Sequence, residues 1–184
     1  VISEIEQGTL TFENKLIEEE YNSALKRLRI RRIEAMPMQK KFLIFTKSGF
    51  EHIVPKGLDH ILFMLGLFFS CLYFRSLLFQ VTAFTIAHSI TLILASQGYV
   101  QIQASIVEPL IALSIVWIAI ENCVFKEPNK WRSLVVFTFG LLHGLGFASV
   151  LSEYGLPKDN FISLLLAFNI GVELGQVFVL IIAF

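Results

Sequence analysis

The stretch that decides the fold is His52-Ile53-Val54-Pro55-Lys56-Gly57-Leu58-Asp59-His60, which leads directly into an apolar run ending at Phe74. Pro55 and Gly57 favour a turn, and the run that follows them is typical of a membrane-spanning helix. An Asp-His pair at the start of such a helix is costly unless it has partners or a function. The partners of Asp59 and His60 must come from elsewhere in the chain.

The composition is that of a membrane protein. Of the 184 residues, 55% are hydrophobic and only 16% are charged, and the mean hydropathy is +0.68. More than half of the charged residues precede residue 57. This pattern predicts a polar N-terminal segment over residues 1–45 and a transmembrane helical domain over residues 46–184. Because the formal net charge is zero, we expect no nucleic-acid partner.

The polar N-terminal segment contains one clear helical pattern. We expect a loop or a short strand over residues 1–13 and an amphipathic helix over residues 14–34, in which Ile17, Tyr21 and Leu28 recur at helical spacing. Acidic residues 18–20 precede a basic cluster over residues 26–32, an order that suits the helix dipole. Such a helix either packs one face on a partner or lies on anionic headgroups. Residues 14–34 are therefore the expected contact for a homo-oligomer or a membrane-complex partner.

The apolar part of the chain predicts an all-α, polytopic membrane helix bundle with about five transmembrane helices. Each span is close to the ~20 residues that a bilayer core requires, and short connectors predict that consecutive helices are antiparallel neighbours. Two options stay open for a sixth span, which is either interfacial or outside this stretch of chain. The stretch Phe42–Phe45 is too short to span and is expected at the interface. The five expected spans are Leu58–Phe74, Leu77–Ser96, Ala104–Phe125, Ser133–Leu151 and Phe161–Phe184.

The connectors and the cysteines give two further expectations. The first and third connectors contain Arg75, Lys126, Lys130 and Arg132, whereas the second and fourth contain only Lys158. The positive-inside rule then places the first and third connectors in the cytoplasm and the N-terminal segment outside, although four lysines between residues 40 and 56 argue for the reverse. Cys71 and Cys123 lie in apolar segments, and we expect buried free thiols rather than a disulfide.

Several ionisable side chains lie at or inside the predicted spans, where a charge at the centre costs about 2.5–3.5 kcal/mol on insertion scales. If consecutive helices alternate in direction, these groups share the half of the membrane on the side of the N-terminal segment. Imidazole and carboxylate together suit Ni²⁺, Co²⁺, Zn²⁺ or Cu²⁺. The pattern predicts a divalent metal site, without an organic cofactor. Its candidate ligands are Asp59, His60, His88, Glu108, His143 and Glu173, with His52 just before the first span.

Other polar residues extend this set along the spans. Asn169, Glu173 and Gln176 share one helix face because they are spaced i, i+4, i+7. Glu121 and Asn122 lie at the opposite end of the third span, where they could form an exit site. The candidate pathway residues are Thr85, Ser89, Thr91, Ser114, Glu121, Asn122, Asn169 and Gln176.

Each of these groups also has a purely structural interpretation. His88 could hydrogen-bond to neighbouring hydroxyl groups, and Asp59 and Glu108 could stabilise helix N-termini. Glycines in Gly140-x-x-x-Gly144 and Gly171-x-x-x-Gly175 favour close helix packing, which should place His143 and Glu173 on neighbouring helices. Convergence of six ionisable groups favours one shared polar pathway over six independent structural roles.

The motifs that carry these residues resemble those of the HupE/UreJ membrane-protein family over about residues 50–184. The matching stretches are Pro55–Phe63, Phe84–Leu92, Glu108–Ile115 with Glu121-Asn122, His143–Ala148 and Phe168–Gln176. The family's His-x5-Asp-His motif maps onto His52, Asp59 and His60, although six residues separate His52 from Asp59 here.

The resemblance implies a multi-pass protein of the bacterial inner membrane that acts as a nickel or cobalt permease. A dehydrated ion would pass between the candidate ligands and leave past Glu121 and Asn122. Uptake should fall as the pH drops through the histidine range, because the ligands bind metal only when deprotonated. No Gly-x-Ser-x-Gly or His-Glu-x-x-His motif occurs in the sequence, and we expect no enzymatic activity.

Three other interpretations remain open. The chain could be a structural or accessory subunit of a membrane complex, in which the polar groups only hold helices together. It could be a metal-dependent membrane enzyme, or an electron-transfer subunit with haem between His88 and His143. Metal-dependent activity without ion flux would favour the enzyme, and a visible absorbance band would favour haem.

Overall fold

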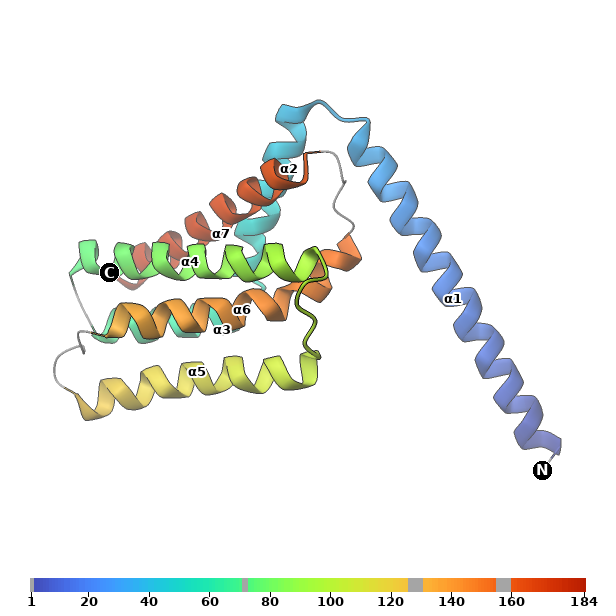
Figure 1. Ribbon diagram of the computed structural model, residues 1–184, viewed down its shortest axis with the longest axis horizontal. Helices are drawn as coiled ribbons and strands as arrows, with labels where there is room; N and C mark the ends of the chain where they lie inside the picture. Colours follow the sequence, from blue (N-terminus) through green and yellow to red (C-terminus); the bar gives the residue numbers. More distant parts are fainter. Residues whose placement is uncertain (1, 71–72, 126–130, 155–159) are drawn as a thin grey trace.

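The computed structural model describes residues 2–70, 73–125, 131–154 and 160–184, and these residues form seven helices without any strand (Figure 1). This confirms the all-α prediction. The helices are α1 (Ile2–Glu34), α2 (Met38–Ile53), α3 (Leu58–Ser70), α4 (Phe74–Ser96), α5 (Ala104–Val124), α6 (Arg132–Tyr154) and α7 (Phe161–Ala183).

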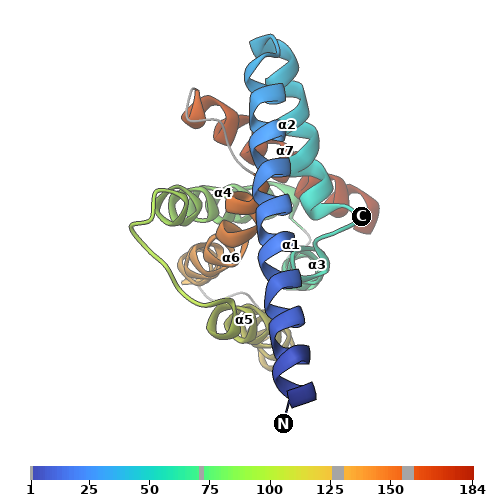
Figure 2. The ribbon, with the colours of Figure 1, turned by 90° about the vertical axis from the view of Figure 1, so that its right-hand side faces the viewer.

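Helix α1 is a single helix of 33 residues that extends away from the other six (Figure 1). The loop or strand expected over residues 1–13 is wrong, because α1 begins at Ile2. That stretch contains one glycine and no proline to interrupt the helix. In Figure 2, α1 crosses in front of α4, α5 and α6, which are seen end-on. The C-terminal end of helix α1 therefore lies beside one end of the bundle, and its N-terminal part points away from that end (Figure 1).

Helices α2 and α3 form a bent pair at the deciding stretch. Their axes differ by 69°, and the bend lies at Val54–Gly57. The first predicted span is shorter than expected, since α3 ends at Ser70 after 13 residues, but α2 and α3 together are long and apolar enough to form one broken span. Phe45, expected at the interface, instead lies in the core with 8% of its surface exposed. Residue 45 is inside α2, so the segment boundary expected there falls within a helix.

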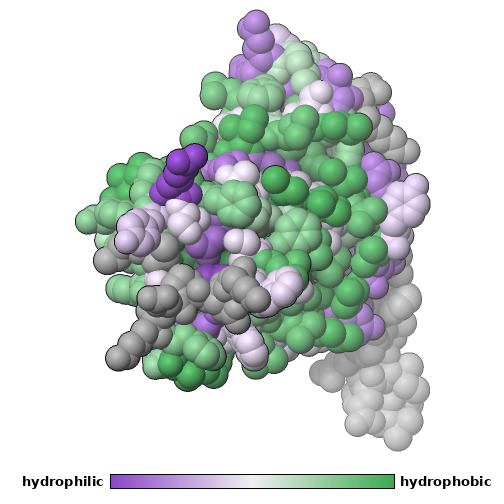
Figure 3. All heavy atoms as spheres, turned by 60° about the vertical axis from the view of Figure 1, so that its left-hand side comes forward, coloured by the Kyte–Doolittle hydropathy of each residue, from purple (hydrophilic) through white to green (hydrophobic). Residues whose placement is uncertain are grey.

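The bundle is a polytopic helical membrane domain. Helices α4, α5 and α7 are each long and apolar enough to cross a membrane, and α6 has a shorter apolar portion over Arg132–Phe147. Figure 3 shows hydrophobic residues over most of the face that it presents, as contact with lipid requires. Within the described residues, three of the five expected spans are therefore found as α4, α5 and α7, and α2 with α3 forms a fourth if the bent pair is one span. The described apolar portion of α6 is shorter than a span.

The closest helix pairs are not consecutive in the chain. Helix α4 packs mainly against α6, and α2 packs mainly against α7. The expectation that consecutive spans pack as neighbours is therefore wrong for these helices. Glycines explain the pairing, because a Cβ atom at Gly140 would lie 2.6 Å from the Phe84 carbonyl oxygen of α4. The backbones of Gly171 in α7 and Gly49 in α2 are similarly close to the facing helix.

The cysteine expectation is partly wrong. Cys123 is a free thiol, but its side chain is exposed on α5 rather than buried in the bundle. The outward face of α5 lets this thiol contact lipid, and the free-energy cost is small because a free cysteine behaves as a small hydrophobic residue. Cys71 lies outside the described residues, as do the connector lysines 126, 130 and 158.

We expect Gly140→Ala to lower the free energy of unfolding by about 1–3 kcal/mol, because the added carbon forces the α4 and α6 backbones apart. Thermal unfolding in mild detergent measures this loss. Gly66→Ala is the matched control, since its added carbon would meet the Ile118 side chain, with Cγ2 2.8 Å away, and no backbone atom of a facing helix. We expect that control to lose less than about 1 kcal/mol. Equal losses in both variants would contradict the account of the α4–α6 packing.

Candidate metal centre

His60 is the central residue of the candidate site. It lies in the first turn of α3, directly after the bend, and only 2% of its surface is exposed. Its Nδ1 atom is 3.1 Å from Oδ1 of Asp59, which fixes the orientation of the ring. The bend therefore turns the Asp-His pair into the bundle, with Nε2 of His60 buried among side chains.

His52 and His88 complete a first group around His60. The ring of His52, from the last turn of α2, has its centroid 4.9 Å from that of His60 and 6.1 Å from that of His88. His88 comes from the middle of α4 and is fully buried, 5.9 Å from the ring of His60. One potential ligand atom from each of the three residues lies within 4.8 Å of the other two.

Asp59 and His143 form a second group with the same histidine. The His143 ring, from the middle of α6, lies 4.9 Å from that of His60. Its Nε2 atom is 3.2 Å from the hydroxyl oxygen of Ser114 in α5. The potential ligand atoms of Asp59, His60 and His143 also lie within 4.8 Å of one another. The two groups share His60 and bring together side chains from four helices.

Several ring nitrogens in these groups are buried without a hydrogen-bond partner among the described residues. They are Nε2 of His52, Nε2 of His60, Nδ1 of His143 and both ring nitrogens of His88. An unsatisfied buried polar group costs about 1–3 kcal/mol. Metal–nitrogen distances are about 2.0–2.1 Å, so two ligand atoms of one ion lie no more than about 4.2 Å apart. Atoms up to 4.8 Å apart must therefore move closer together to share an ion. The donor types of these residues fit a divalent metal.

Aromatic rings enclose the histidines. Phe147 of α6 lies 3.9 Å from the ring of His52, and Phe84 of α4 lies 5.0 Å from that of His143. Phe168 of α7 stacks on Phe147, with the two rings 12° from parallel. These rings make the surroundings of the histidines apolar, which strengthens electrostatic attraction between an ion and its ligands.

Two predicted ligands lie outside these groups. Glu108 is exposed near the start of α5 and belongs to neither group. Glu173 is half-buried in α7, where its Oε1 atom accepts a hydrogen bond of 2.8 Å from the Thr82 hydroxyl group of α4. One turn further along, Thr85 donates a 2.9 Å hydrogen bond to the side-chain oxygen of Gln176. Glu173 and Gln176 thus join α7 to α4, which is the helix that carries His88.

The remaining pathway residues on α4 and α7 mostly bond to their own helix. The hydroxyl group of Ser89 donates to the Thr85 carbonyl oxygen, and that of Thr91 donates to the carbonyl oxygens of Ala87 and His88. Asn169 donates to the Leu165 carbonyl oxygen, while its side-chain oxygen is buried with no partner in the described part of the chain.

A second buried polar cluster lies at the other end of the bundle. Arg132, in the first turn of α6, is 3% exposed, and its guanidinium lies 3.5 Å from the Glu121 carboxylate of α5. Arg132 also donates to the Gln80 side-chain oxygen at 3.2 Å and to the hydroxyl group of Ser70. Ser70 in turn bonds to Asn122, which donates to the Gly66 carbonyl oxygen at 2.8 Å. Glu121 and Asn122 are therefore joined through one arginine to α3, α4 and α6.

Sequence reasoning missed Arg132, Gln80, Ser70 and Thr82 as members of these clusters. The sequence indicates a connector charge at Arg132, because it stands at the end of a polar loop. Thr82 could have been found, since it lies three residues before Thr85 on the same helix face. The six residues between His52 and Asp59 differ from the five of the family motif, yet the turn at Pro55–Gly57 brings the His52 ring back to His60.

The HupE / UreJ protein family model matches residues 28–184. The chain belongs to the HupE/UreJ family. No curated protein and no solved structure matches the chain. The match covers the six helices that carry both polar clusters and the C-terminal end of α1.

We expect Arg132→Gln to lower the free energy of unfolding by about 3–5 kcal/mol, because it leaves the Glu121 carboxylate buried without its positive partner. Chemical unfolding in detergent measures the change. Combining Arg132→Gln with Glu121→Gln removes both charges, and the double variant should recover a large part of the loss. Glu121→Gln alone completes the comparison. If the loss in the double variant equals the sum of the losses in the two single variants, the ion pair is not the source of the effect.

Proposed function

We propose that this HupE/UreJ protein transports a divalent transition metal ion across the membrane, with nickel or cobalt as the substrate. The observation that supports this proposal is the pair of buried ligand groups that share His60 and contain unpartnered ring nitrogens. Membership of the family agrees with it, because HupE/UreJ proteins are associated with nickel and cobalt transport or with accessory functions. We propose no catalysed reaction.

The donor set favours the borderline metals. Four imidazoles and one carboxylate are available from His52, Asp59, His60, His88 and His143. This mixture suits Ni²⁺ and Co²⁺, and Zn²⁺ or Cu²⁺ could also bind, whereas Mg²⁺ and Ca²⁺ prefer oxygen ligands alone. Selection among the borderline metals then depends on geometry and on supply.

The shared histidine suggests how an ion moves. An ion held by His52, His60 and His88 could pass to Asp59, His60 and His143 while His60 remains bound. Only part of the ligand set changes at that step, so the ion is never without protein ligands in the apolar interior. Asp59 interacts with Nδ1 of His60. This leaves Nε2 of His60 available to the ion and increases the basicity of that nitrogen.

The proposed route crosses the bundle from the α2–α3 bend to the Arg132 cluster. We propose that the protein lies in the bacterial inner membrane with its N-terminal segment outside, so that the ion enters near the bend. At the far end it would pass Glu121 and Asn122, where the guanidinium of Arg132 now contacts Glu121. Like charges repel, and so the arginine must move away before a cation can pass.

An accessory function is the second candidate. Metal binding by the histidines without flux would indicate a protein that holds or delivers the ion within a membrane complex. The clusters that join α4 to α7 and α3 to α6 would then serve only to hold helices together. Flux measurements separate the two functions directly.

We expect His60→Ala to weaken nickel binding by at least about 100-fold, because changes outside the ligand shell already cost about 10–100-fold. The purified protein in mild detergent should contain nearly stoichiometric nickel by elemental analysis, and His60→Ala should contain none. In proteoliposomes with an internal nickel indicator, His60→Ala and His143→Ala should both reduce uptake to the background rate.

Glu108→Gln is the matched control for these variants, because Glu108 is exposed and outside both ligand groups. It should keep nickel binding within about twofold of the unaltered protein, as a change away from the site should. Uptake at the unaltered rate by both histidine variants would contradict the proposal. Binding that depends on His60, without uptake by any variant, would instead favour the accessory function.

Nickel binding should be lost as the pH falls, since protons compete with the ion for the imidazole nitrogens. The loss should come below the pH range in which exposed imidazoles titrate, because apolar surroundings disfavour a charged ring. Equilibrium dialysis with radioactive nickel over a pH series measures it. Binding that does not change at any pH at which the protein stays folded would contradict the proposal.

A further inference from the structure

Helix α1 presents an apolar stripe that nothing in the described chain covers. The α1 stripe consists of Ile17, Tyr21, Ala24 and Leu28, which follow one another at spacings of four, three and four residues. Ile17, Tyr21 and Leu28 are 64%, 63% and 62% exposed. This is the heptad spacing by which two helices pack along a common seam.

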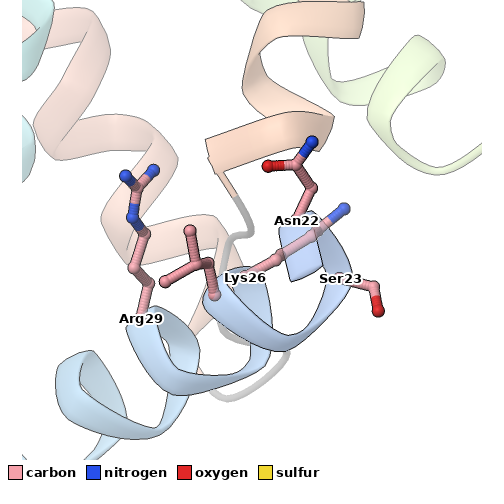
Figure 4. Close-up of a pocket in the computed structure, with 5 residues that line it drawn as sticks. Asn22, Ser23, Lys26 and Arg29 are labelled. Atoms are coloured by element: carbon pink, nitrogen blue, oxygen red, sulfur yellow. The ribbon is translucent and has the colours of Figure 1, made fainter. Parts of the chain in front are cut away.

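A neighbouring side of α1, rather than the stripe, faces the bundle. Asn22, Leu25, Lys26 and Arg29 line a cavity of about 460 Å³ there, and Figure 4 shows Asn22 and Arg29 directed from α1 toward the neighbouring ribbons. Helix α1 is also held at its C-terminal end, where Nζ of Lys41 donates a 3.0 Å hydrogen bond to the Glu34 carbonyl oxygen. This side of α1 is turned toward its own chain, and the α1 stripe is left exposed.

We propose that the α1 stripe binds the α1 stripe of a second copy of this chain in an antiparallel pair. The charges beside the stripe support this occupant. Residues 18–20 are all glutamates, and Lys26 and Arg27 follow one heptad later. A headgroup-binding helix is expected to be basic beside its apolar face, and an acidic block there would be repelled by anionic lipids.

The same charges fix the direction of the pair. A parallel, in-register pair would place glutamates 18–20 of one helix beside those of the other. An antiparallel pair with Ile17 opposite Leu28 places residues 18–20 opposite residues 25–27, and it places Tyr21 opposite the small Ala24. Glu20 and Arg27 each directly precede a stripe residue, so both copies of the Glu20–Arg27 pair flank the seam, where charges determine partner choice and direction.

The position of α1 on the bundle is compatible with this symmetry. Two copies in one membrane are related by a two-fold axis along the membrane normal. Such an axis reverses the part of the α1 direction that lies in the membrane plane, and it keeps the lean of α1 away from the bundle that Figure 1 shows. The two stripes can then meet with their in-plane directions opposed while both bundles keep the same orientation.

Cysteine cross-linking distinguishes the antiparallel pair from its alternatives. In full-length protein with Cys71 and Cys123 replaced by serine, Tyr21→Cys and Ala24→Cys are made in differently tagged chains and reconstituted in liposomes. We expect a disulfide between chains only in the mixture, because Tyr21 faces Ala24 and not itself. Glu19→Cys is the control on the opposite side of α1 and should give no cross-link. A cross-link in either stripe variant alone indicates a parallel pair and overturns the proposal.

A charge exchange tests the same pair without cysteine chemistry. Glu20→Lys alone or Arg27→Glu alone places like charges at both flanking positions, and each should reduce the dimer fraction by about tenfold. A mixture of the two variants restores both opposite-charge pairs and should dimerise as the unaltered protein does. Light scattering in detergent and energy transfer between labelled chains in liposomes measure this. A monomeric unaltered protein, or a mixture that remains monomeric, contradicts the proposal.

These outcomes do not depend on metal transport. Nickel binding by the α1 variants should equal that of the unaltered protein, which shows that the bundle is folded whatever the dimer fraction. If a fluorescent label at Tyr21→Cys reports lipid contact and no variant cross-links, the α1 stripe lies on the membrane and the proposed pair is wrong.

Discussion

The structure depends on the burial of two histidine rings, those of His52 and His60, at the bend between α2 and α3. The turn at Pro55–Gly57 lets α2 and α3 meet at 69°, so that His52 at the end of one helix faces His60 at the start of the other. Buried imidazoles need partners, because an unpaired polar group in an apolar interior is costly. The three further groups that reach His60 come from its own turn, from α4 and from α6. The site therefore requires α4 and α6 to approach closely, and glycines of α6 permit this approach.

The glycines on α6 connect packing to chemistry. Gly140 and Gly144 flank His143 and lie against the α4 backbone at Phe84 and His88. Because no side chain separates the helices there, His88 and His143 are held on two helices that touch. Phenylalanine rings then cover the outside of the group, which keeps the surroundings apolar. A larger residue at either glycine would move the histidines apart as well as weaken the packing. Stability and ligand geometry are therefore set by the same contacts.

Most of the fold could be predicted from the sequence, and most of the helix pairing could not. Apolar runs near bilayer length and short connectors predicted the helices from Phe74 onward to within a few residues, because a membrane permits few alternatives. His60, His88 and His143 were identified as costly polar groups on the same grounds. The sequence could not predict that α4 packs on α6, or that Glu108 faces outward, because these depend on which helix faces meet. Arg132 was missed for the same reason, since its partners Glu121 and Gln80 lie on two other helices.

The most direct measurement of the central claim is X-ray absorption spectroscopy of the nickel-loaded protein, compared with nickel-loaded His88→Ala and His143→Ala. If the ion is shared between two groups that meet at His60, the unaltered protein should show imidazole ligands. Each variant should retain some of them, because the other group remains intact. A spectrum of nickel bound by water and carboxylate oxygen alone, identical in all three proteins, would contradict the claim and would assign the buried histidines to helix packing.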